Sequence, residues 1–184
     1  VKIEAKVQGP AWVRARSAAI FLNGRKIRDT TLGADEGNRS GLKWSATWEL
    51  EEQAHDGYLV LVARGPGIQA PYWPIPKPYQ HTRIHYQPEV IAVTGAVRFD
   101  ADGDDSFTAP RGYAEELVRR TGPNAEALID RLTSYDRAVA AQAVEVFRDE
   151  HPDAWDEAAL TDELSETAPE VRAGIDTYLN TLNP

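Results

Sequence analysis

The sequence predicts an α+β protein with segregated halves: an immunoglobulin-like antiparallel β-sandwich at residues 1–99, then a bundle of stacked α-helical hairpins at 110–184. Apolar runs of strand length fill the first half, and apolar residues at helical spacing fill the second. The charge changes at the same place. Residues 1–99 hold 13 Lys and Arg against 9 Asp and Glu, and residues 100–184 hold 7 against 20. A shift of this size indicates two structural units with different surfaces.

Five or six strands are expected in the first half. Leu42–Leu50 has an apolar residue at every second position from Leu42, so these residues are expected on one buried face. Asn23-Gly24 between two strand-like runs is typical of a type I′ hairpin turn. Gly57–Ala63 is almost wholly apolar, which favours a central strand. The expected strands are Lys2–Val7, Ala18–Leu22, Arg25–Thr31, Leu42–Leu50, Gly57–Ala63 and Ile91–Phe99, with a polar loop at 33–41.

Five helices are expected in the second half. The first has Pro110 at its start and Gly122 just past its end, the usual asymmetry of helix termini. The third is rich in alanine, which predicts a close approach between helices. The expected helices are Pro110–Thr121, Asn124–Thr133, Tyr135–Asp149, Asp153–Ser165 and Pro169–Leu182.

Residues 65–88 form a proline-rich and aromatic-rich segment that is expected to be a long irregular loop, because proline removes ladder donors. Two interpretations of its rings stay open. They pack over an open end of the sandwich, or Tyr72, Trp73 and Tyr79 form a platform that binds a carbohydrate or a peptide.

Composition excludes several classes of function. The chain has no cysteine, so disulfides, thiol catalysis and zinc–cysteine sites are absent. No apolar run reaches the roughly 18 residues of a membrane helix, so no membrane partner is expected. The acidic second half and the scattered basic residues of the first argue against nucleic-acid binding. The chain begins at Val1 and has no methionine, so it is expected to be a piece of a longer protein.

The junction at residues 100–109 is the candidate metal site. An EF-hand loop carries oxygen ligands at positions 1, 3, 5, 7 and 9 and a bidentate carboxylate at position 12. Counting from Asp100, these oxygen positions fall on Asp100, Asp102, Asp104, Ser106 and Thr108.

Two departures from the EF-hand pattern matter. Asp105 replaces the usual glycine at position 6, and Arg111 at position 12 is no ligand, so the last carboxylate would come from Glu115 or Glu116. The alternative is a polar turn that caps the following helix without a metal. A structural Ca²⁺ is therefore one of two interpretations that the residues leave open.

Several phrases resemble the region that follows the catalytic domain in bacterial metallohydrolases of the PHP superfamily, the CehA/McbA group. These phrases, all within about residues 1–115, are GPAWVRA, AIFLNGRKIR, the GPG…PYWP…KPY loop and AVTGAVRFDADGDDSFTAPRGYA. The resemblance implies a non-catalytic accessory module, structural or domain-docking, whose partner is an upstream domain of the same polypeptide. It also implies that the parent enzyme is metal-dependent and compatible with export, although the sequence itself fixes no compartment.

The sequence of the chain itself shows no recognisable catalytic motif. The four histidines are His55, His81, His85 and His151, without a His-x-His pair, so the family's metal ligands have nothing to map onto. His81 and His85 have the spacing of two metal ligands on one face of a helix. They lie in the proline-rich segment, where no helix is expected, so the spacing does not predict that the two rings meet. No nucleophile elbow or phosphate loop is present. No enzymatic activity is therefore expected of this chain.

Overall fold

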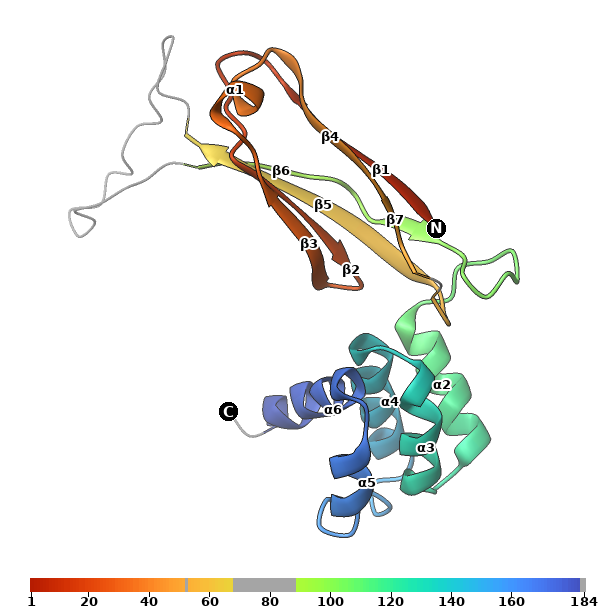
Figure 1. The fold of residues 1–184 in the computed structure, drawn as a ribbon. Helices are drawn as coiled ribbons and strands as arrows, with labels where there is room; N and C mark the ends of the chain where they lie inside the picture. Colours follow the sequence, from red (N-terminus) through yellow and green to blue (C-terminus); the bar gives the residue numbers. More distant parts are fainter. Residues whose placement is uncertain (52, 68–88, 183–184) are drawn as a thin grey trace, which may run out of the picture. The chain divides into compact units, whose positions relative to one another are not determined.

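The computed structural model describes residues 1–51, 53–67 and 89–182 and shows a mixed protein with antiparallel sheets and six α-helices (Figure 1). The chain divides into two compact units. The first consists of Val1–Glu52 and Tyr58–Val97, and the second of Gln53–Gly57 and Arg98–Pro184. The short Gln53–Gly57 segment therefore belongs with the helices, although it lies between two strands. No helix among the described residues has the length and apolar character needed to cross a membrane.

The first unit contains two antiparallel sheets. β1 (Lys2–Gly9) pairs with β4 (Gly41–Glu49), and a larger sheet has the order β3-β2-β5-β6 with β7 also on β5. The bounds of these other strands are β2 Ser17–Leu22, β3 Arg25–Thr31, β5 Gly57–Pro66, β6 Glu89–Val93 and β7 Val97–Phe99. β2 and β3 form the expected hairpin, with positive φ at both Asn23 and Gly24.

The expected strand Ile91–Phe99 is two strands, since the chain leaves the ladder at residues 94–96. The expected polar loop at 33–41 contains a single helical turn, α1 (Ala34–Gly37). Gly37 is required there because a Cβ atom on it would lie 2.0 Å from the carbonyl oxygen of Ala15. The core of this unit is small. Its central cluster consists of Val7, Ala18, Leu32 and Ala63, with side chains from both sheets.

The prediction for the buried face of β4 is wrong at its start. Leu42 is 45% exposed, and Lys43 is 2% exposed. The cause is a bulge: Val7 pairs with Trp44 and Gln8 with Leu42, so Lys43 is the extra residue and turns inward. Its Nζ atom donates hydrogen bonds to the carbonyls of Gly37 and Arg39, while burial lowers the pKa of the amine. The lysine thus holds the end of α1 against β4.

The helices of the second unit are α2 (Pro110–Thr121), α3 (Ala125–Arg131), α4 (Arg137–Glu150), α5 (Thr161–Glu166) and α6 (Pro169–Leu182). α2 and α6 have the predicted bounds. α5 is shorter than predicted, because residues 151–160 form turns rather than the first part of the helix. α4 packs against both α2 and α6 around a core that includes Leu128, Val144 and Phe147.

The contact between α4 and α6 depends on Gly174. A Cβ atom at this position would lie 2.4 Å from the carbonyl oxygen of Arg137. Helix propensity alone favours alanine over glycine by about 1 kcal/mol. Close packing should outweigh this preference, and we expect Gly174→Ala to lower the free energy of unfolding by about 2 kcal/mol. Urea denaturation of the two proteins would measure this change in the free energy of unfolding.

Asn180→Ala is the matched control, since Asn180 is exposed on the same helix. It should change the free energy of unfolding by no more than about 0.5 kcal/mol. Stabilisation by Gly174→Ala would show that α4 and α6 are not in close contact at this point.

Candidate functional site

Three carboxylates meet in the second unit. One oxygen from each of Asp56, Asp100 and Asp102 lies within 4.8 Å of the others. Asp100 and Asp102 are exposed residues of the loop before α2, whereas Asp56 is fully buried in the Gln53–Gly57 segment. Among the described residues this is the one group of three potential metal ligands so close together. Asp56 was not predicted as part of it.

Asp56 holds the following loop through backbone hydrogen bonds. Its Oδ1 atom accepts from the N–H of Ala101 at 2.8 Å, and Oδ2 accepts from the N–H of Thr108 at 2.7 Å. Burial alone would raise the pKa of Asp56. The N–H groups of Ala101, Thr108 and Asp102 and the Tyr113 hydroxyl reverse this effect and hold the pKa below its usual value. Asp56 is therefore a structural anion.

The loop also folds on its own side chains. Asp100 accepts from the N–H of Gly103 at 2.6 Å through Oδ1 and from that of Asp105 at 2.8 Å through Oδ2. Asp104 accepts from both the N–H and the hydroxyl of Ser106. Asp105 has a φ of 65°, so position 6 of the loop takes the left-handed conformation that glycine takes in an EF-hand.

Tyr113 of α2 links the loop to Asp56. Its hydroxyl donates to Oδ2 of Asp102 at 2.7 Å and accepts from the N–H of Asp56 at 3.2 Å. Burial and the hydrogen bond to Asp102 raise the pKa of this phenol well above its ordinary value. Tyr113 therefore stays protonated at neutral pH and is unsuited to be a base or a nucleophile.

His55 lies beside this network in an aromatic cluster. Its ring stacks on Tyr135 with centroids 5.5 Å apart and meets the edge of Tyr113 at 5.6 Å. Its Nδ1 atom lies 2.8 Å from the carbonyl oxygen of Asp56, and Nε2 lies 3.8 Å from Oδ1 of Asp136. Asp136 accepts from the first N–H groups of α4. The histidine is 5% exposed and packs within this aromatic cluster.

The other predicted metal ligands lie in separate interactions. Thr108 contributes its N–H to Asp56, and Ser106 bonds to Asp104. Glu115 forms an ion pair with Arg111 at 3.0 Å, and Glu116 forms ion pairs with Arg119 and Arg120. The hydrogen bonds from Arg119 and Arg120 lower the pKa of Glu116. Neither glutamate belongs to the three-carboxylate group, and Asp56 takes the place that the sequence assigned to them.

The predicted ring platform of Tyr72, Trp73 and Tyr79 lies outside the described residues, as do His81 and His85. That interpretation stays a prediction from the sequence. His151, at the end of α4, packs its ring against Phe147 with centroids 5.3 Å apart.

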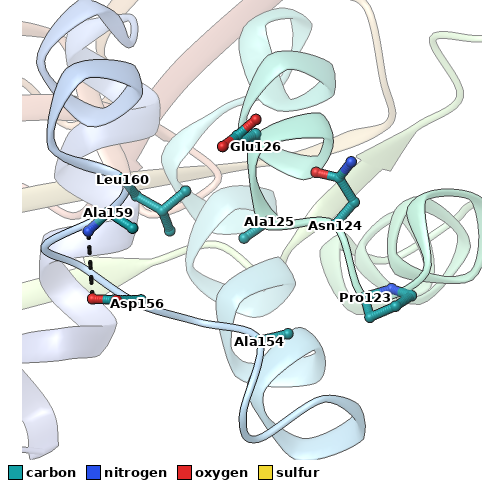
Figure 2. Close-up of a pocket in the computed structure, with 8 residues that line it drawn as sticks. All are labelled: Pro123, Asn124, Ala125, Glu126, Ala154, Asp156, Ala159 and Leu160. Atoms are coloured by element: carbon teal, nitrogen blue, oxygen red, sulfur yellow. Dashed lines mark hydrogen bonds between the residues drawn. The ribbon is translucent and has the colours of Figure 1, made fainter.

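A second feature of this unit is an open pocket of about 340 Å³. Figure 2 shows Pro123, Asn124 and Ala125 at the start of α3 on one side, with Asp156, Ala159 and Leu160 on the other. Ala154 and Glu126 complete the lining. Asn124 caps α3 by accepting from Ala127, and Asp156 accepts from the N–H groups of Ala158 and Ala159. The lining therefore combines small apolar side chains with two carboxylates, and it contains no basic group.

We compared the chain with protein-family models, curated proteins and solved structures, and none of them matches it.

The Asp56 network predicts a large effect of a small substitution. Asp56→Asn removes the charge and puts an NH₂ donor in place of one of the two oxygens that accept backbone N–H groups, so we expect a loss of about 3 kcal/mol in the free energy of unfolding of the second unit. The loss should shrink as the pH falls. Because the folded pKa of Asp56 lies below its unfolded value, its stabilisation is present above about pH 4 and disappears below it.

Denaturation of both proteins between neutral pH and about pH 2, followed by tryptophan fluorescence and circular dichroism, would measure this difference. Asp104→Asn is the control. It removes the same charge from an exposed residue of the same loop, and its effect should stay below about 0.5 kcal/mol. Equal effects of the two substitutions would contradict the anchoring role of Asp56.

Proposed function

We propose that this chain is a non-catalytic accessory module of a larger PHP-type metallohydrolase, whose first unit docks against another domain of the same polypeptide. One observation supports this most. Among the described residues, all the large hydrophobic side chains that are exposed belong to the first unit: Val1, Trp12, Leu42, Ile91, Val93 and Val97. Exposed apolar surface concentrated in one unit is typical of an interface.

The small core of the first unit supports the same proposal. Among its described residues, the buried hydrophobic ones are Ala5, Val7, Ala18, Ile20, Leu32, Leu59 and Ala63, of which three are alanines. Buried apolar area is the main source of folding free energy, at about 25 cal/mol per Å². A unit of this size with so little buried area gains stability by covering its exposed residues with a partner domain.

A difference between the two outer strands of the larger sheet supports one of them as the docking surface. β3 carries charged residues along its length, among them Arg25, Lys26 and Arg28, which discourage pairing with another strand. β6 has only Glu89 at its start, while Ile91 and Val93 are more than half exposed. We therefore assign the docking surface to β6.

The finer architecture belongs to the same proposal. Side chains from both sheets share one cluster in the first unit, which supports an immunoglobulin-like sandwich. The packing of α4 against its neighbours α2 and α6 supports stacked helical hairpins in the second. Both architectures are common in accessory modules, so they fit the role without specifying it.

The chemistry of the carboxylate site supports a structural role over catalysis. Its buried carboxylate accepts two backbone N–H groups, and its tyrosine is held protonated. We propose that Asp100 and Asp102 of the 100–108 loop bind Ca²⁺ together with Asp56 of the Gln53–Gly57 segment. Oxygen ligands suit this ion, and its charge would offset the repulsion among three carboxylates. The ion would fix the loop and the start of α2.

The docking proposal predicts a difference in hydrogen exchange. In the longer polypeptide that carries this chain, amides of β6 should exchange at least about tenfold more slowly than in the isolated chain, because a partner covers them. Amides of β3 serve as the internal control and should exchange alike in both. Equal protection of β6 in both forms would contradict the docking surface.

An activity assay tests the non-catalytic part separately. The isolated chain should show no phosphoesterase turnover with added Mn²⁺ or Zn²⁺. Metal-dependent turnover that survives rigorous purification would overturn this part of the proposal.

The calcium proposal predicts a metal-dependent melting temperature. Ca²⁺ at a hundredfold excess over its dissociation constant should stabilise the native protein by about 2.7 kcal/mol relative to a chelator. Asp102→Asn should abolish the difference, because it removes one ligand charge while its side-chain oxygen can still accept from Tyr113.

Asp105→Asn is the matched control for the calcium experiment. It removes the same charge at a left-handed position that asparagine tolerates well, and it lies outside the three-carboxylate group, so the calcium response should remain. Identical melting in calcium and in chelator would leave the loop as a capping turn without metal.

A further inference from the structure

The pocket beside α3 lies in the most one-sided charge environment of the chain. Residues 149–166 contain eight Asp and Glu and no Lys or Arg. All but one of the eight are exposed residues, and no salt bridge within the part of the chain that the structure describes involves any of them. Elsewhere in this unit the helices pair their charges, as Arg172 does with Asp176. This segment therefore carries a concentrated negative charge that no salt bridge among the described residues offsets.

The pocket has the shape and chemistry for one particular kind of side chain. Ala154 and Ala159 offer apolar surface, and Glu126 and Asp156 supply carboxylates (Figure 2). A lysine or arginine has the same two parts, an aliphatic stem and a cationic head. Glu126 is exposed, so its carboxylate is accessible to such a head group.

We propose that this pocket receives a Lys or Arg side chain from a basic segment of a partner protein. Charge complementarity selects this occupant. A free amine would use the pocket alone, whereas a segment with several basic residues also matches the acidic residues from 149 to 166 around it. The binding relieves repulsion among carboxylates and takes up an open pocket of about 340 Å³. The inference concerns a different unit from the docking surface on β6 and does not depend on it.

A labelled peptide tests the inference on the full chain. The probe is fluorescein-labelled Lys-Ala-Lys-Ala-Lys-Ala-Lys, and binding is measured by fluorescence anisotropy at low salt. The same peptide with all lysines acetylated is the neutral control. We expect the charged peptide to bind and to weaken steeply with added salt, and the acetylated peptide to bind at least about tenfold more weakly. No binding of the charged peptide, or equal binding of both, would overturn the inference.

Three variants separate the effect of the pocket from that of the general negative charge. Glu126→Gln should weaken binding about two- to fivefold, the range of an exposed ion pair. Glu150→Gln removes the same charge from an exposed residue that does not line the pocket, and it should have a smaller effect. Ala159→Phe fills the pocket at an exposed position without changing any charge and should weaken binding about tenfold.

Circular dichroism and thermal melting would establish that each variant remains folded. Equal effects of Glu126→Gln and Glu150→Gln, or unchanged binding after Ala159→Phe, would show that the peptide senses only the diffuse charge of the surface and would overturn the pocket assignment. The comparison of the two glutamates stands even where the phenylalanine variant is unstable.

Discussion

The second unit depends on one buried anion. A carboxylate removed from water costs several kcal/mol unless fixed donors replace the lost hydration. Asp56 meets this requirement with the N–H groups of Ala101 and Thr108, which lie 45 and 52 positions further along the chain. Those bonds fix both ends of the intervening loop and set where α2 begins. The position of Tyr113 follows, and with it the aromatic cluster around His55.

The two units differ in how many large apolar side chains they bury. The second buries a continuous cluster from Ala114 to Ile175, with Phe147, Leu128 and Leu132 fully enclosed. Among its described residues, the first buries few large apolar side chains, has Lys43 at one inward position, and leaves Trp12, Ile91 and Val93 more than half exposed. A domain with a small core and exposed apolar residues on an outer strand would gain more from a partner than a domain with a full core. This contrast supports the first unit, rather than the second, as the docking element of the proposed assembly.

Local signals in the sequence predicted the local structure well. The proline and glycine that flank α2 gave its bounds, and Asn23-Gly24 gave the hairpin, because both signals act through the backbone of adjacent residues. Lys43 could not be predicted, since its inward turn results from a bulge that depends on pairing with β1. Asp56 was missed for the same reason. A polar residue before an apolar strand resembles an ordinary loop residue, and only contacts about fifty residues away make it a buried anchor.

Hydrogen bonds within the protein already hold the 100–108 loop and its carboxylates in place. A carboxylate offers about four acceptor sites, and the backbone and Tyr113 take about two on each of Asp56, Asp100 and Asp102. The occupied sites explain why the loop takes the EF-hand conformation at Asp105 without a bidentate carboxylate at position 12. The remaining acceptor sites leave room for a cation. Ca²⁺ would therefore add stability to a loop that its backbone donors have shaped, and its removal would loosen the junction without unfolding the helices.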